Sequence, residues 1–195
     1  GKMFERIIGL LTEMDYVELV DGEPTVTEEG ERLARIHNVS DLLVAQCLKR
    51  GIWDELDPAE LAGVASMCVF ENRKATGGYP EAATDRMADA MNATQRIYGE
   101  LASDEQRHRL PPTAVPDPGF ALSVHQWAAG APLGYALAAA AESGAELTPG
   151  DFVRWCRQVI DLLEQIVQTG YSDEIKHNAR RAVDAIRRGV VTIGN

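Results

Sequence analysis

Residues 148–168 read TPGDFVRWCRQVIDLLEQIVQ, and this stretch decides the fold class of the chain. Thr148, Pro149 and Asp151 form a helix start signal: a hydroxyl that can cap the first turn, a proline in that turn, and a carboxylate three residues after the cap. Gly170 is typical of the residue that ends a helix. The stretch therefore predicts one long helix, rich in apolar residues, that packs against other helices.

The polar residues of this segment lie on one narrow side of the expected helix. At 100° per residue they fall within a stripe about 80° wide. Two interpretations are open for this polar ridge. It is either the solvent-facing stripe of a core helix or the lining of a channel, in which Arg contacts phosphate and Gln or Asp contacts sugars or base edges. The ridge consists of Arg154, Gln158, Asp161, Gln165 and Gln168.

Further helices are expected over most of the chain. The clearest begins at Asp57-Pro58-Ala59-Glu60, again a capping residue, a first-turn proline and a Glu three residues after the cap. Residues 72–80 carry Gly77-Gly78 and Pro80 and are predicted to form a loop. The pattern indicates a mainly α fold, a helical bundle. The other expected helices span residues 40–49, 57–70, 81–109, 121–129, 133–142 and 172–188.

The first 39 residues have a different pattern. Residues 3–14 predict an amphipathic helix, residues 16–26 a hairpin that turns at Asp21-Gly22, and residues 27–36 a second helix. This order is similar to the tail of a winged-helix unit. Because the opening helices of such a unit are missing, we expect Gly1 to be a cut inside a domain. The expected division is residues 1–39 and residues 40–195.

Composition narrows the classes of function. The net charge of −11 argues against a protein that binds nucleic acid by bulk electrostatics. Residues 1–71 hold 15 of the 30 acidic side chains and 6 of the 19 basic ones, so the remainder is nearly neutral and can accept a polyanion. No apolar run suggests a membrane span or signal peptide. Cys47, Cys68 and Cys156 lie apart in apolar stretches, as expected for buried free thiols of a cytoplasmic protein.

Several segments carry a resemblance to a known family. In family order they match the DSHCT domain, the C-terminal helical domain of superkiller-type DExH RNA helicases, and they are most similar to its actinobacterial HelY-like branch. The match covers about residues 40–193, and residues 3–36 resemble the end of the preceding winged helix. The matching segments are SDLLVAQCL (40–48), GIWDELDPAELA (51–62), CVFE (68–71), DEQRHR (104–109), GDFVRWCRQ (150–158) and RRGVV (187–191).

The resemblance implies a role for the segment that contains the polar ridge. Members of this family are ATP-driven translocases: two RecA-like domains hydrolyse ATP with Mg²⁺, and the winged helix and the bundle close a ring around single-stranded RNA. A ratchet helix in the bundle touches the strand, and residues 151–168 match it. Arg154 and Arg157 would then meet phosphate or stack on bases, and Gln158, Asp161 and Gln165 would make polar contacts. Relatives often have a basic residue at the position of Gln158.

The motor itself has no counterpart in this sequence. There is no G-x-x-x-x-G-K-[ST] and no D-E-x-H motif, so no ATP site of the family type is expected in residues 1–195. We therefore expect the chain to be a part of an enzyme, with no cofactor of its own and no catalytic residue. Its expected partners are single-stranded RNA or DNA and the RecA-like and winged-helix domains of the same polypeptide, with no membrane.

Two alternatives from other classes stay open. Glu105-x-x-His108 and Glu174-x-x-His177 have the spacing that carboxylate-bridged di-iron bundles use, although charged helix ends also explain them. A stand-alone winged-helix regulator with a helical dimerisation bundle is the other alternative. The acidic N-terminal third argues against it, because most duplex binders are basic there.

Overall fold

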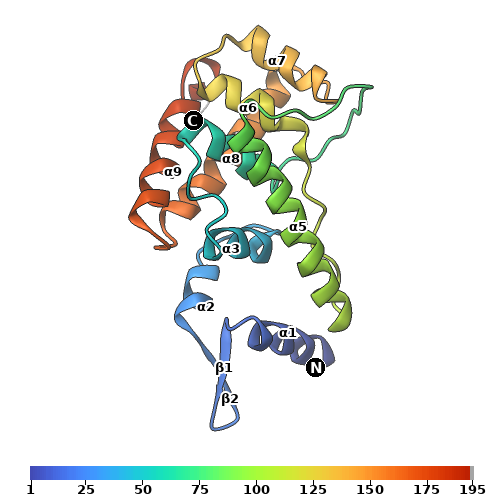
Figure 1. Cartoon of the computed structure of the whole chain (residues 1–195), viewed down its shortest axis with the longest axis vertical. Coiled ribbons are helices and arrows are strands. Elements are labelled where there is room, and N and C mark those ends of the chain that lie inside the picture. Colours follow the sequence, from blue (N-terminus) through green and yellow to red (C-terminus); the bar gives the residue numbers. More distant parts are fainter. Residues whose placement is uncertain (194–195) are drawn as a thin grey trace.

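A computed structural model describes residues 1–193 of the chain. The helical bundle lies above the N-terminal hairpin unit in Figure 1, and helices account for most of the chain. The prediction of a mainly α fold is confirmed. The elements are α1 (Lys2–Glu13), β1 (Val17–Val20), β2 (Glu23–Val26), α2 (Glu28–Leu33), α3 (Asp41–Lys49), α4 (Pro58–Ser66), α5 (Asp85–Arg107), α6 (Ala121–Ala128), α7 (Leu133–Glu142), α8 (Pro149–Val167) and α9 (Asp173–Ile186), with 3-10 turns at Pro118–Phe120 and Gly189–Thr192.

The N-terminal unit has the helix, hairpin and helix order expected from its sequence. Strands β1 and β2 pair antiparallel, with Val17 opposite Val26. Asp21 and Gly22 both have positive φ, 52° and 82°, as the tight turn between the strands requires. Helix α2 packs so closely on the hairpin that a Cβ on Gly30 would lie 2.1 Å from the backbone oxygen of Tyr16. A glycine is therefore needed where α2 crosses the hairpin.

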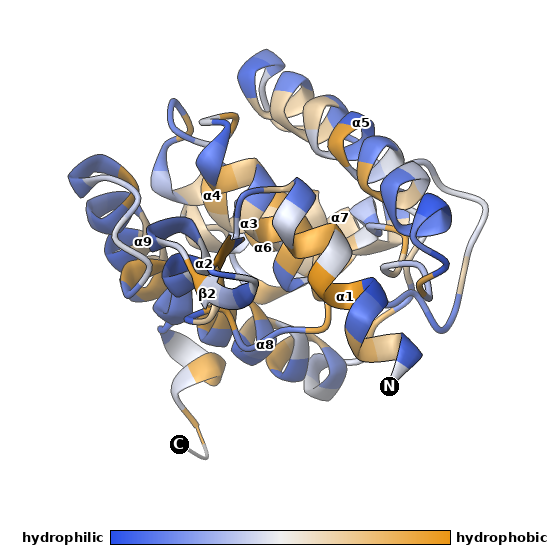
Figure 2. Cartoon of the chain, turned by 90° about the horizontal axis from the view of Figure 1, so that it is seen from below, coloured by the Kyte–Doolittle hydropathy of each residue, from blue (hydrophilic) through white to orange (hydrophobic). Residues whose placement is uncertain are grey.

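Helix α4 is the centre of the bundle. It packs against α5, α6, α8 and α9, and all but its first two residues are buried. This is why its sequence is apolar on every side. The helices around it are amphipathic instead: Figure 2 shows hydrophilic residues along the outer sides of α5 and α9. These outer helices therefore each bury one face against α4 and its neighbours.

The two largest differences from the expected helix boundaries are at the end of α4 and the start of α5. Helix α4 ends at Ser66 and not near Phe70, because the Met67 carbonyl accepts a hydrogen bond from the Asp117 backbone N–H at 2.9 Å. After this turn Phe70 packs in an aromatic cluster, where its ring centroid lies 5.4 Å from that of Phe120 and 5.0 Å from that of Trp155. Helix α5 begins at Asp85 and not at residue 81, because the Thr84 hydroxyl caps it by accepting from the Met87 N–H.

The remaining structural predictions concern the cysteines and the membrane. Cys47, Cys68 and Cys156 are buried free thiols, as predicted. Within residues 1–193, no helix combines the length and the apolar composition that a bilayer crossing requires.

Candidate nucleic-acid interface

Helix α8 divides into a buried face and the polar ridge, as its periodicity predicts. Phe152, Cys156, Val159 and Leu163 are fully buried, whereas the ridge residues are exposed except for Gln165, which is half-buried. The Thr148 hydroxyl and the Asp151 carboxylate cap the first turn reciprocally. The capping fixes where the helix starts, and burial of its apolar face fixes which residues face outward.

The C-terminal end of the ridge is attached to another part of the chain. The side-chain oxygen of Gln165 accepts a hydrogen bond from the backbone N–H of His37 at 2.7 Å. The Arg35 guanidinium lies 3.5 Å from the backbone oxygen of Gln168. This end of α8 therefore holds the segment that connects the N-terminal unit to the bundle.

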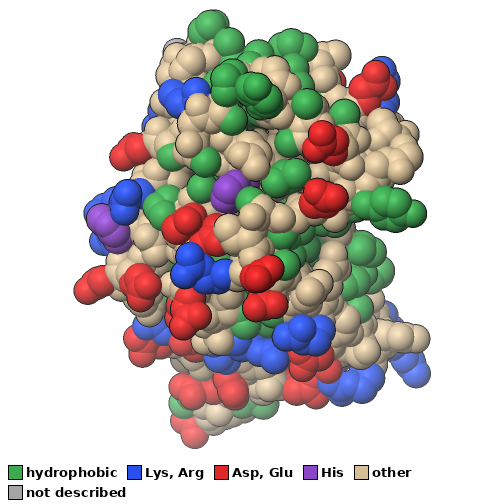
Figure 3. Space-filling view, turned by 45° about the horizontal axis from the view of Figure 1, so that its top comes forward, with side chains coloured by type: hydrophobic (Ala, Val, Ile, Leu, Met, Phe, Trp, Pro, Cys, Tyr) green, Lys and Arg blue, Asp and Glu red, His purple; other side chains and the backbone are tan. Residues whose placement is uncertain are grey.

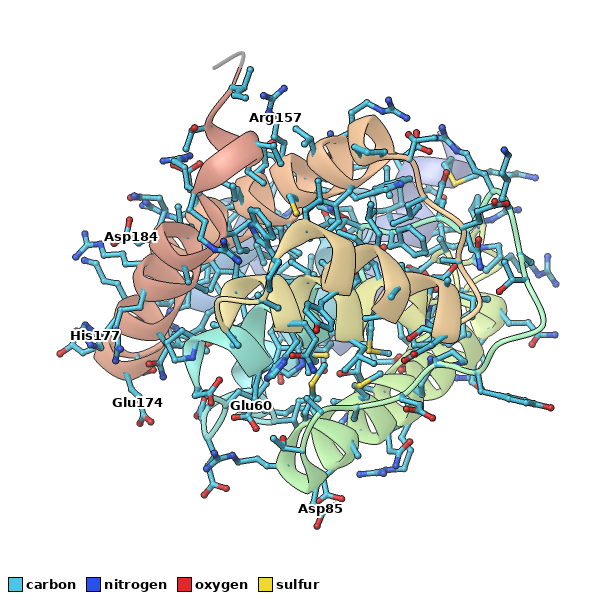
Figure 4. The ribbon with its side chains drawn as sticks, turned by 90° about the horizontal axis from the view of Figure 1, so that it is seen from above. Glu60, Asp85, Arg157, Glu174, His177 and Asp184 are labelled. Carbon is cyan, nitrogen blue, oxygen red and sulfur yellow. The ribbon has the colours of Figure 1, made fainter. Side chains whose placement is uncertain are left out.

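Arg157 also makes a contact within the chain. It is half-buried at the edge of the ridge, and its guanidinium donates to the Ile193 carbonyl. Figure 4 shows its side chain beside the C-terminal segment. The structure thus separates Arg157 from Arg154, although the family resemblance implies strand contact for both.

The N-terminal end of the ridge is open. The Arg154 side chain is 65% exposed and forms an ion pair with Asp151 one turn earlier. Arg154, Trp155 and Gln158 face the segment that follows α4. Two adjoining surface hollows lie between them and that segment, and we call the two together the Trp155 hollow. Its lining residues are Val69, Glu71, Arg73, Lys74, Glu146, Leu147, Asp151, Arg154, Trp155 and Gln158.

The charges around the Trp155 hollow balance. Three basic side chains and three acidic ones line it. On another face, shown in Figure 3, Lys and Arg side chains are likewise interspersed with Asp and Glu. Neither surface forms a broad basic field that would gather polyanions non-specifically. Any strand contact at α8 must therefore depend on individual side chains.

Asp161 lies between the two ends of the ridge. The pKa of its carboxyl is raised from the usual value, because partial burial and the neighbouring Glu164 carboxylate outweigh the lowering effect of the Arg187 guanidinium. A carboxylate in this position accepts hydrogen bonds, which suits a sugar hydroxyl or a base N–H and repels a phosphate.

Arg73, Glu71 and Trp155 were not among the residues predicted for the site. Trp155 contacts Phe70 edge-on, with the ring centroids 5.0 Å apart, and it is only partly buried. Arg73 places its guanidinium carbon 5.6 Å from the Trp155 ring centroid. The contact between Arg73 and Trp155 depends on how residues 70–76 cross the start of α8. This segment has no helical periodicity, so the sequence pattern could not indicate the contact.

The residues of the di-iron alternative do not come together. The Glu105 carboxylate is occupied by the backbone and hydroxyl groups of Thr113, at 2.9 and 2.8 Å. Figure 4 shows Glu174 and His177 pointing outward from the start of α9. Among residues 1–193, no three His, Cys, Asp or Glu side chains are grouped as a metal site.

Comparison with known proteins identifies the family. The model of the DSHCT (NUC185) domain matches residues 23–193. The chain belongs to the DSHCT family. This DSHCT chain is 46% identical over 199 aligned positions to proteins named "Probable helicase HelY" from Mycobacterium tuberculosis (strain ATCC 25618 / H37Rv) and Mycobacterium leprae (strain TN). The alignments cover 99% of the chain but 22% of each relative, so the chain spans about a fifth of their length.

Proposed function

We propose that this chain is the C-terminal part of a cytoplasmic ATP-dependent RNA helicase, and that the polar ridge of α8 contacts the single-stranded RNA that the enzyme threads. The RecA-like domains that bind ATP and Mg²⁺ lie elsewhere in the polypeptide. One observation carries the proposal: α8 buries one face in the bundle, yet Arg154, Gln158 and Asp161 form an exposed line along it. Arg154 and Gln158 of this line also border the Trp155 hollow.

The chemistry of this line suits a strand that moves. Arg154 can donate to a phosphate, and Gln158 and Asp161 can pair with a ribose hydroxyl or a base edge. A few contacts of this kind bind weakly, which lets a strand advance. Because the chain carries a net charge of −11, we expect weak, salt-sensitive binding by the chain alone.

The N-terminal unit supports docking to other domains of the same polypeptide. Phe4 on α1 and Leu19 and Val26 on the hairpin are more than half exposed. Large apolar side chains gathered on one small unit are typical of a surface that another domain covers. We propose that this unit belongs to the winged helix and packs on a RecA-like domain.

The test uses the full-length helicase. In the double variant Arg154→Ala with Asp161→Ala, we expect RNA-stimulated ATP hydrolysis and unwinding to fall about thirtyfold, since two contacts worth about 1 kcal/mol each are lost. The matched control is Arg181→Ala with Asp184→Ala, which removes the same two charge types from the exposed side of α9. Unwinding at the wild-type rate in the ridge variant would show that the ridge is only a solvent-facing stripe.

A further inference from the structure

We propose that the Trp155 hollow binds a nucleobase of the threaded strand, stacked on the Trp155 indole and covered by the Arg73 guanidinium. The inference rests on the proposed function, because it needs a strand that lies along α8. It adds a mode of contact: a base held by its ring face, next to the ridge residues that would hold phosphate and sugar.

The Trp155 ring is held in place and partly open to solvent. Phe70 contacts it edge-on, with an interplanar angle of 72°, while the Arg73 guanidinium lies above the ring. The other two tryptophans differ, since Trp53 is 0% exposed and Trp127 is 3% exposed. Trp155 is therefore the tryptophan that a ligand can reach.

A second arginine–tryptophan pair in the chain shows what a closed stack looks like. Arg188 lies 3.7 Å from the Trp127 ring centroid and donates to the carbonyls of Trp127 and Ala131 at 2.7 and 2.6 Å. That arginine is fixed on a buried ring. The Arg73 guanidinium carbon is 5.6 Å from the Trp155 centroid, and its side chain is 73% exposed. Arg73 can therefore swing aside and close again over an inserted base.

The backbone beside Arg73 is well anchored, which keeps its side chain over Trp155. The Asn72 N–H donates to Asp117 at 2.9 Å, and the Asn72 side-chain amide donates to the Gly144 carbonyl at 2.8 Å. On the other side, the Lys74 carbonyl accepts from the Glu146 N–H at 3.2 Å. A fixed backbone with a movable guanidinium is the arrangement that a clamp requires.

The charge balance of the hollow favours a base over a phosphate. Its three acidic side chains offset its three basic ones, so little attraction remains for a polyanion. Stacking on an aromatic ring needs no net charge and accepts every base, because each has a π face. Glu71 pairs with Arg73 at 3.5 Å and can also accept from the N–H groups of a base.

The experiment follows the tryptophan emission of this chain at low salt, while a short oligouridylate or an abasic ribose-phosphate strand of equal length is added. Trp53 and Trp127 also emit but are buried, so a base that stacks on the partly exposed Trp155 should quench only the Trp155 share of the emission. Binding is measured in parallel by the anisotropy of a labelled strand. We expect the oligouridylate to quench the emission and the abasic strand to bind about tenfold more weakly without quenching. Trp155→Phe should abolish the quenching and weaken oligouridylate binding several-fold, while its ring preserves the contact with Phe70.

Arg73→Ala provides the second variant, because an exposed loop side chain can be removed without disturbing the fold. We expect it to weaken oligouridylate binding several-fold and to leave abasic binding unchanged, whereas Arg181→Ala should change neither. Equal affinity for the two strands, or binding without quenching, would overturn the stacking proposal and leave strand contact by the ridge standing. Failure of both strands to bind would overturn the stacking proposal together with the ridge contact.

Discussion

The backbone N–H of His37 donates a hydrogen bond to the side-chain oxygen of Gln165, 2.7 Å away and 128 positions along the chain. This bond joins the segment after α2 to the outer face of α8. It lies on the same polar ridge as Arg154 and Gln158, whose side chains are exposed beside the Trp155 hollow. One helix face thus has a structural end and an open end.

Substitution at the structural end should affect stability. We expect Gln165→Ala to lower the free energy of unfolding by about 1 kcal/mol, because the His37 N–H loses its partner in a partly exposed site. Gln165→Glu retains an oxygen acceptor and should stay near the wild-type value, and Gln158→Ala at the open end should change stability by less than about 0.5 kcal/mol. Urea unfolding measures all three. Equal losses for Gln165→Ala and Gln165→Glu would contradict the role of the hydrogen bond.

The starts of α4 and α8 could be predicted because capping signals lie within a few residues of each other in the sequence. The start of α4 was correct because the capping box joins Asp57 to Glu60, three residues apart, and the same reasoning placed the start of α8 at Thr148. The end of α4 was wrong because it depends on the Asp117 N–H, 50 positions from the Met67 carbonyl that accepts it. Contacts of that range leave no trace in helical periodicity.

The same distinction separates the parts of the candidate site. The ridge follows from the 3.6-residue period of one helix, so its residues could be named from the sequence. The contact between Arg73 and Trp155 requires the loop after α4 to cross α8, and hydrogen bonds from Asn72 to Asp117 and Gly144 hold that loop. Gln165 and Arg157 make hydrogen bonds within the chain, to His37 and Ile193, and these likewise depend on segments distant in the sequence.

A buried carboxylate at the start of α4 makes stability depend on pH. Burial raises the pKa of Glu60, but the Asp57 N–H, the Thr84 hydroxyl and the Arg86 guanidinium together outweigh it, and the pKa lies below 4.5. Because the folded-state pKa is the lower one, the ionised carboxylate stabilises the fold above pH 4.5. That contribution is lost as the pH falls through the folded-state value.

Glu60→Gln should therefore lower the free energy of unfolding by about 1–3 kcal/mol at neutral pH. The difference in unfolding free energy from the wild type should narrow as the pH falls below about 4.5, because the carboxylate is protonated first in the unfolded chain and, at lower pH, in the folded chain. Urea unfolding at several pH values measures the gap. Glu55→Gln, on the exposed side of the same segment, should show neither effect. A gap that stays constant with pH would refute the role of the charged form.

The thiols should be inert until the chain unfolds. Burial raises the pKa of Cys47 to about 12 and the pKa values of Cys68 and Cys156 further above the usual range, so the reactive thiolate is scarce at neutral pH. We expect Ellman's reagent to label no thiol in the native chain within minutes and all 3 cysteines in denaturant. Rapid labelling of a thiol in the native chain would show that the segment around that cysteine opens locally.

The hairpin unit provides the sharpest steric prediction. Gly30→Ala puts a Cβ 2.1 Å from the backbone oxygen of Tyr16 and 2.8 Å from the Val26 side chain, so α2 must move away from the hairpin at a cost of about 1–3 kcal/mol. Gly99→Ala is the matched control: it lies in α5 with no heavy atom within 4 Å of the added carbon, and it should stabilise the chain by about 0.5–1 kcal/mol.

Because α2 leads directly to His37, the same change should reach α8. In Gly30→Ala the His37 amide should exchange its hydrogen faster than in the wild type, since the displaced segment no longer holds its bond to Gln165. In Gly99→Ala the exchange should be as slow as in the wild type or slower. Unchanged His37 exchange in Gly30→Ala, with stability lowered as expected, would show that α2 moves without transmitting its displacement to the ridge.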